Sequence, residues 1–187
     1  MGMYKDVMGT LVRVLAADNI DNSTKQSWQK LIDADLRQGG NGSSLSPRDK
    51  FDYDCCLYAL LHRQLAPAQW DVLVAKYSTH KANKVAAIGR LASRMISPAP
   101  ELFIYKALTA WAIPKLKGVQ SGKRSTDMIV LPAEFYDMNT WDLAGSPERT
   151  RRNWRGGIHK RLEQMEEVAV IHATEIFDRE QIFVDAA

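Results

Sequence analysis

The chain has few cysteines and histidines among its 187 residues, and their spacing suits neither disulfides nor metal sites. Its two cysteines, Cys55 and Cys56, are adjacent, and neighbouring cysteines seldom bridge one another. We therefore expect reduced thiols in the core, which is typical of a reducing compartment. No histidine has a Cys or His partner at a metal-ligand spacing, so we expect no metal and no other cofactor. The histidines are His62, His80, His159 and His172.

The sequence also lacks long apolar runs and an N-terminal export signal. No apolar stretch approaches the ~20 residues that a membrane span needs, and no basic segment with an apolar run precedes a small-residue cleavage site. With 45% apolar and 25% charged residues, the composition is that of an ordinary globular protein. We expect a cytoplasmic protein without membrane contact.

Catalytic motifs are missing as well. There is no Gly-rich phosphate loop, no Gly-x-Ser-x-Gly and no His-Glu-x-x-His. The carboxylates Asp49, Asp52 and Asp54 are spaced as Mg²⁺ ligands can be, but such residues more often begin a helix, where they favour its dipole. His62 near the cysteines hints at a thiol nucleophile, although the cysteines occupy an apolar face. We expect no enzymatic activity, and keep a Mg²⁺-dependent nuclease or hydrolase as an alternative.

Charge is distributed unevenly, although the net value is only +3. Between Val72 and Thr126 there are ten Lys or Arg residues and one acid, Glu101. Between Glu163 and Ala187 there are seven acids and one cation, Arg179. A basic middle beside an acidic end is typical of a protein with a polyanionic partner. The acidic end itself is most simply a solvated helix.

Helical periodicity dominates and strand signals are nearly absent, so we predict a mainly α fold: a helical bundle with one or two helix-turn-helix-like units. Residues 1–113 would form an N-terminal bundle with a basic hairpin at 67–95. Residues 114–130 would be a basic linker, and 131–187 a C-terminal helix-turn-helix with an acidic terminal helix. The predicted helices span residues 4–17, 23–37, 47–64, 67–77, 82–95, 101–113 and 147–176. The expected core positions of the third are Phe51, Cys55, Tyr58 and Leu61.

The stretch from Ser146 to Leu162 resembles the second helix of a helix-turn-helix. Ser146 is a natural N-cap and Pro147 a natural first helical residue. Trp154, Ile158, Leu162 and Met165 fall on one apolar face, and the opposite face is basic. A short helix over 132–142, burying Phe135, Met138 and Trp141, and a Gly-containing turn would complete the motif. The expected DNA contacts are Arg149, Thr150, Arg151, Arg152, Asn153, Arg155 and Lys160.

Two features of this region leave alternatives open. Gly156 and Gly157 permit close approach to a phosphate backbone, or else mark a kink or the end of the helix. A plain amphipathic helix with a solvated basic face is the simpler interpretation of the whole stretch. The hairpin at 67–95 has the proportions of a second helix-turn-helix, with a basic hairpin of the core as the alternative. The residues expected here and in the linker to contact nucleic acid or polymerase are Lys76, Lys81, Asn83, Lys84, Arg90, Arg94, Lys115, Lys117, Lys123 and Arg124.

Parts of the sequence resemble Q-type phage late-gene antitermination proteins. The resemblance is carried by residues 69–77 and 84–91, and by 131–141 leading into 146–155. It implies a DNA-binding regulator that loads on promoter-proximal RNA polymerase with its σ factor, travels near the RNA exit channel and suppresses pausing and termination. The implied partners are double-stranded DNA, RNA polymerase with σ, and nascent RNA. A zinc element of some such proteins is not implied, because its cysteines are missing. The alternative within the binding class is a conventional promoter-bound helix-turn-helix activator or repressor.

Overall fold

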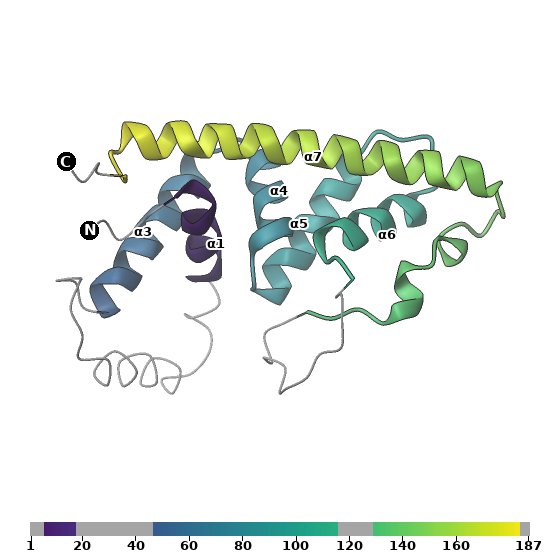
Figure 1. The fold of residues 1–187 in the computed structure, drawn as a ribbon, viewed down its shortest axis with the longest axis horizontal. Helices are drawn as coiled ribbons and strands as arrows, with labels where there is room; N and C mark the ends of the chain where they lie inside the picture. Colours follow the sequence, from purple (N-terminus) through teal and green to yellow (C-terminus); the bar gives the residue numbers. More distant parts are fainter. Residues whose placement is uncertain (1–5, 18–46, 116–128, 184–187) are drawn as a thin grey trace. The chain divides into compact units, whose positions relative to one another are not determined.

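The computed structural model describes residues 6–17, 47–115 and 129–183 (Figure 1). These residues are mainly α-helical and include no strand, which confirms the predicted fold class. The helices in this part of the chain are α1 (Val7–Ala17), α3 (Pro47–Gln64), α4 (Pro67–Tyr77), α5 (Lys81–Arg94), α6 (Glu101–Ala112) and α7 (Glu148–Arg179). None of these helices is long and apolar enough to cross a membrane. The helix predicted at 23–37 and the candidate contacts Lys117, Lys123 and Arg124 lie outside the described residues.

The chain divides into two compact units. The first comprises Met1–Pro67 with Val170–Ala187, and the second Ala68–Ala169. This grouping differs from the predicted order of bundle, linker and C-terminal segment, because α7 contributes residues to both units. Each unit buries its own apolar side chains, as expected for a helical protein in which every amphipathic face needs a partner.

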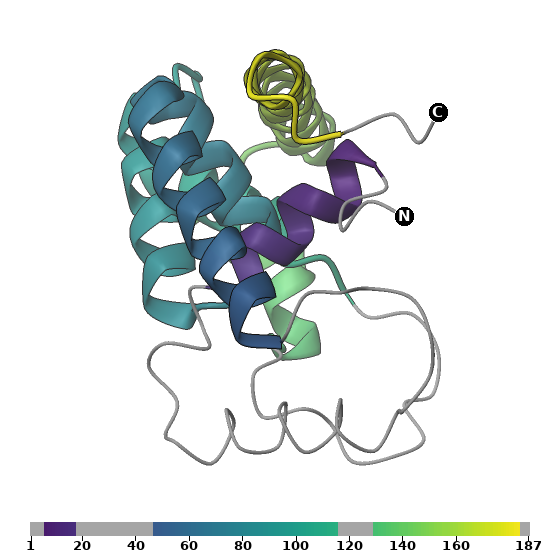
Figure 2. The ribbon, with the colours of Figure 1, turned by 90° about the vertical axis from the view of Figure 1, so that its left-hand side faces the viewer.

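In the first unit, α1 and α3 pack against each other and lie side by side in both views (Figure 1, Figure 2). Leu11 and Leu15 of α1 and Leu61 of α3 are fully buried. An ion pair joins the same two helices, with Nε of Arg13 2.7 Å from the buried carboxylate of Asp54. The apolar contact and the buried charge pair together set how α1 lies on α3.

The buried face of α3 differs from the predicted one. Leu57 and Leu61 are buried, whereas Phe51 and Tyr58 are half-buried and both cysteines are exposed. The expectation of core thiols is therefore wrong. The observed face instead buries Leu57 and Leu61 together with the carboxylate of Asp54, which forms an ion pair with Arg13 of α1.

In the second unit, α6 is the central helix. Eight of its twelve residues are buried, and the ring of Phe103 meets the rings of Trp141 and Trp154 edge-on at centroid distances of 5.4 and 5.5 Å. Edge-to-face pairs of this kind add about 0.5–1.5 kcal/mol each beyond the apolar area they bury. Phe103 thus joins α6 both to the segment that precedes α7 and to α7 itself.

A single buried lysine connects the ends of two helices in this unit. Lys84 of α5 is only 7% exposed, and its Nζ donates to the main-chain oxygens of Lys76, at 3.1 Å, and Ala112, at 3.5 Å. These carbonyls belong to the last turns of α4 and α6, where no intrahelical donor is available and the helix dipole is negative. Burial, and to a lesser extent the charge of Lys76, lowers the pKa of Lys84 to about 8.

The segment before α7 is not the predicted α-helix. Residues 132–142 form two short 3₁₀ turns, Ala133–Tyr136 and Met138–Thr140, separated at Asp137. The Asp137 carboxylate accepts a hydrogen bond from the main-chain N of Asn139 at 2.9 Å, and this local bond competes with helix continuation. Trp141 is fully buried as expected, but the first helix of the predicted helix-turn-helix is absent here, and Phe135 and Met138 are only half-buried.

Gly156 and Gly157 neither end nor interrupt α7, which continues through both. A methyl group added at either position would meet no atom within 4 Å. Both therefore carry the entropic cost of glycine in a helix interior without a packing reason inside the described structure.

The glycines lead to a first stability prediction. Replacing Gly156 or Gly157 with Ala should raise the free energy of unfolding by roughly 1 kcal/mol, because Ala loses less backbone entropy in a helix. Gly89→Ala in α5, where space is equally open, should behave alike. Gly145→Ala should instead destabilise, because Gly145 has φ +69°. Denaturant titrations of the four variants measure these differences, and a loss of stability in Gly156→Ala would show that α7 is not a plain helix there.

The low pKa of Lys84 predicts a pH dependence of stability. A lysine whose pKa falls from 10.5 to about 8 on folding binds its proton less well in the folded chain, so stability rises with pH between these values. We expect the free energy of unfolding to increase by about 2 kcal/mol between pH 7 and pH 9.5 from this group alone. Denaturant titrations across this range should show the increase in the wild type and not in Lys84→Met.

The titrations stay below pH 10 because above that pH Tyr77 makes the free energy of unfolding fall as pH rises, opposite to the effect of Lys84. Burial and the hydrogen bond to Glu166 raise the pKa of the Tyr77 hydroxyl, so its contribution to stability is lost as pH rises past 10.0. An equal rise in the wild type and Lys84→Met would contradict the role given to Lys84.

Candidate nucleic-acid interface

The first half of α7, residues 148–161, has the two faces that the sequence predicts; we call this segment the basic half of α7. Ile158 and Leu162 are buried in the core of the second unit, and Trp154 and Met165 are half-buried. The candidate DNA contacts Arg149, Arg152, Asn153 and Lys160 are exposed, and Thr150, Arg151 and Arg155 are half-buried. The core face thus holds the helix in place while the basic face remains accessible.

The charged residues of α7 are arranged opposite to the order that its dipole favours: cations are concentrated in the N-terminal half and acids in the C-terminal half. The basic half contains six Lys or Arg residues and one acid, Glu148, whereas residues 163–179 contain five acids and one cation, Arg179. Cations in the first turn of a helix lie near its positive pole, which costs about 0.3–1 kcal/mol each at the surface. Arg149 and Arg151 occupy this position. The helix dipole therefore does not explain their placement.

One intrahelical ion pair offsets part of this charge. Arg152 donates to Glu148 at 2.6 Å, but both side chains are well exposed, and surface pairs at this spacing contribute only about 0.3–0.5 kcal/mol. A phosphate can therefore compete for the Arg152 guanidinium. No other ion pair involves the basic half of α7 among the described residues.

The turn that leads into α7 is held by a buried carboxylate. Oδ1 of Asp142 accepts from the main-chain N of Ala144 at 3.0 Å, and Oδ2 from that of Ser146 at 2.7 Å. The hydroxyl of Ser146 lowers the pKa of Asp142 most. The two main-chain bonds and the charge of Arg151 lower it further. The guanidinium of Arg155 lies over the ring of Trp141, 5.8 Å from its centroid. Arg151 and Arg155 are thus positioned against the turn.

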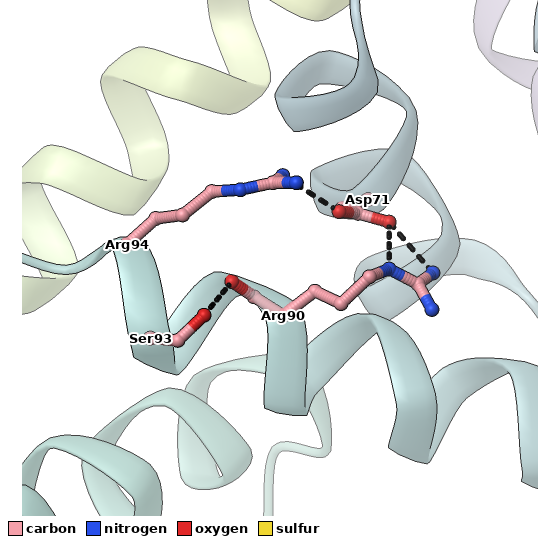
Figure 3. A network of polar contacts seen from close by, with 4 residues as sticks. All are labelled: Asp71, Arg90, Ser93 and Arg94. Atoms are coloured by element: carbon pink, nitrogen blue, oxygen red, sulfur yellow. Dashed lines mark hydrogen bonds and ion pairs between the residues drawn. The ribbon is translucent and has the colours of Figure 1, made fainter.

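The basic hairpin of α4 and α5 has much less available charge than its composition indicates. Asp71 of α4, with a side chain 3% exposed, binds Arg90 at 2.7 Å and Arg94 at 2.8 Å (Figure 3). The hydrogen bond to Asp71 raises the pKa of Arg90. Asp71 directly precedes Val72, the first residue of the range in which ten cations and one acid were counted, so that count did not include it. The two guanidinium groups, each about half exposed, mainly hold α5 against α4.

The other candidate contacts of this region are scattered. Lys84 is buried and donates to two helix ends, so it is not part of an accessible surface. Lys76 is half-buried, with its Nζ 4.2 Å from the centroid of the Trp111 ring. Lys81 and Lys115 are exposed, and Asn83 is half-buried beside His80, whose Nδ1 accepts from the Asn83 main-chain N at 3.2 Å. The hairpin is therefore a weaker candidate surface than the basic half of α7.

The Mg²⁺-dependent enzyme considered above would need a group of side chains that can hold a metal ion. In the part of the chain that the structure describes, no group of three or more His, Cys, Asp or Glu side chains could hold a metal ion. Within the carboxylate cluster considered above, Asp54 is buried against Arg13, while Asp49 and Asp52 are exposed on α3.

Sequence reasoning overlooked His159, which lies one turn after Arg155 on α7. It is half-buried, its Nε2 is buried without a hydrogen-bond partner, and the main chain of Ala107 in α6 is close enough to act on its pKa, which it raises. Burial lowers its pKa most, followed by the charge of Arg155. The sequence signal was the i,i+4 spacing of the two residues, but the contact with α6 was not visible in it.

Comparison of the chain with protein-family models, curated proteins and solved structures finds no significant match.

Proposed function

We propose that this protein is a DNA-binding transcription regulator that contacts double-stranded DNA through the basic half of α7. The observation that carries the proposal is the group of exposed cations on the basic half of α7, Arg149, Arg152 and Lys160, of which Arg149 lies in the first turn, where the helix dipole disfavours a cation. Phosphate groups compensate such a surface, because each neutralised phosphate releases condensed counterions. The unpaired main-chain N–H groups of the first turn add donors of the same polarity.

The side chains on this face suit both roles that a DNA contact requires. Arg149 and Arg152 have planar donors that match guanine edges, and Asn153 has the paired donor and acceptor that match adenine. Lys160 and Thr150 suit phosphate contacts, which position a helix without reading sequence. Since the predicted first helix of the helix-turn-helix is replaced by 3₁₀ turns, we propose that α7 binds without that motif's usual support.

The resemblance to Q-type antitermination proteins extends the proposal to polymerase. In this view the protein loads beside a promoter, engages σ-containing RNA polymerase and suppresses termination. Exposed Lys81 and Lys115 and the half-exposed Arg90 and Arg94 then contact polymerase or nascent RNA. The support for this step is the resemblance together with these cations outside α7.

Charge removal on α7 tests DNA binding. The double variant Arg149→Ala, Arg152→Ala should bind duplex DNA at least tenfold more weakly, and the slope of log affinity against log salt should become shallower by about two. Fluorescence anisotropy with duplexes at several salt concentrations measures both. The matched control is Arg48→Ala, Arg63→Ala, which removes the same charge from exposed positions of α3. If the two folded double variants bind DNA equally well, the basic half of α7 is not part of the DNA-binding surface.

Transcription through a terminator separates antitermination from ordinary regulation. In single-round transcription with purified polymerase and σ factor, the protein should raise the fraction of transcripts that pass an intrinsic terminator, only on templates with its own promoter-proximal element. A conventional activator or repressor changes the number of transcripts and leaves that fraction constant. Lys81→Glu with Lys115→Glu should lower read-through while leaving duplex affinity nearly unchanged, because neither residue lies on α7. A constant read-through fraction would reject the antitermination part of the proposal.

A further inference from the structure

We propose that two copies of this protein pair through the exposed face of α7, with the two helices antiparallel and related by a two-fold axis next to Glu163. The inference goes beyond the proposed function and does not rest on it. Both use Arg149 and Lys160, so a dimer has to dissociate before these side chains contact DNA.

The exposed side of α7 is a continuous seam of residues. Ile158, Leu162, Ala169, Ala173 and Ile176 are buried on the opposite side of the helix. The exposed residues recur at steps of three and four, which is the spacing of a helix face that can meet a second helix. All of them belong to one uninterrupted helix, so their alignment is a property of α7 itself. We call this set the α7 seam: Arg149, Asn153, Gly156, Lys160, Glu163, Glu167, Ile171, Thr174 and Asp178.

The α7 seam is accessible and its charges are uncompensated within the described chain. All its members are exposed except Thr174, which is half-buried. Among the described residues, none of its charged side chains forms an ion pair. The large apolar side chain of Ile171 is 50% exposed in the middle of these polar residues. A partner of the seam therefore has to supply both opposite charges and cover for one apolar side chain.

A second copy of α7, reversed end to end, supplies those charges. In an antiparallel pair centred next to Glu163, Arg149 of one copy faces Asp178 of the second. In the same register Lys160 faces Glu167, and two-fold symmetry repeats each contact. Glu163 meets its own copy near the axis, and Lys160, three residues away, offsets part of this repulsion. A parallel pair would place the basic halves together, so charge complementarity favours the antiparallel arrangement.

The same register gives Gly156 and Ile171 a common use. They face each other across the antiparallel pair, and a methyl group at Gly156 would meet no atom of the described chain within 4 Å. A glycine leaves the helix backbone open to close approach, so Ile171 of the second copy lies over Gly156 and is removed from water. This contact explains a helix-interior glycine that has no packing reason within the described structure.

We expect a weak, salt-sensitive dimer, because exposed ion pairs contribute little individually and are screened by salt. Sedimentation velocity of the full chain without nucleic acid measures it, at protein concentrations up to about 0.5 mM, the range of weak complexes. The dissociation constant should rise several-fold between about 50 mM and about 500 mM salt.

Charge exchange along the seam tests the register. Arg149→Glu with Lys160→Glu should raise the dissociation constant at least tenfold, roughly 1.4 kcal/mol or more, because acids then meet acids. Glu167→Lys with Asp178→Arg should do the same by placing cations against cations. All four changes in one chain restore opposite charges at every exchanged contact, so the dimer should return to within a few-fold of the wild type. The changes at 149 and 178 suit the helix dipole, so loss of the dimer is not loss of the helix.

The matched control is Arg48→Glu with Arg63→Glu, which makes the same net charge change at exposed positions of α3 and should dimerise like the wild type. A monomeric wild type, or a fourfold variant that stays monomeric, would overturn the inference. Loss of the dimer in the control would attribute it to net charge and reject the seam. A monomeric wild type that binds DNA through α7 leaves the proposed function standing, whereas a seam-dependent dimer without DNA affinity supports the inference while the proposed function fails.

Discussion

A single buried ammonium group organises the second unit of this protein. The last turns of α4 and α6 both point carbonyl oxygens at Nζ of Lys84, which lies in the first turn of α5. Near the other end of α5, Arg90 and Arg94 bind the buried carboxylate of Asp71. Helix α5 is thus fixed to its neighbours at both ends by charged groups. Removing one partner of such a buried arrangement leaves the other uncompensated, so each charge depends on its partner.

This internal use of charge changes the meaning of the basic composition. Of the described lysines and arginines in the middle of the chain, one caps helices, two neutralise a buried acid and one lies over a tryptophan ring. The basic half of α7 differs, because its cations have only Glu148 as an ion-pair partner among the described residues. Arg149 and Lys160 are exposed and have no ion pair or hydrogen bond among the described residues, so they are the better candidates for an external ligand.

Local periodicity was sufficient for the helices but not for the polar contacts between them. The bounds of α4 and the two faces of α7 follow from proline, capping and apolar spacing, all of which act over a few residues. The burial of Lys84 depends on Ala112, 28 residues away, and Asp71 meets Arg90 and Arg94 at separations of 19 and 23 residues. No local pattern reports such pairings. The α3 face was misjudged because its sequence offers two apolar phases, and 132–142 because one aspartate side chain competes with the helix.

The reversed charge order of α7 has a consequence for helix stability and for the proposed binding of DNA. An acidic residue at position 149 or 151 would suit the positive pole of the helix and stabilise it, and would also repel a polyanion. Variants selected for thermal stability alone would therefore have a lower affinity for a polyanion. Such a trade-off is common where a site is held in a locally unfavourable arrangement. Under the proposed DNA contact, stability and DNA affinity would oppose each other at Arg149 and Arg151.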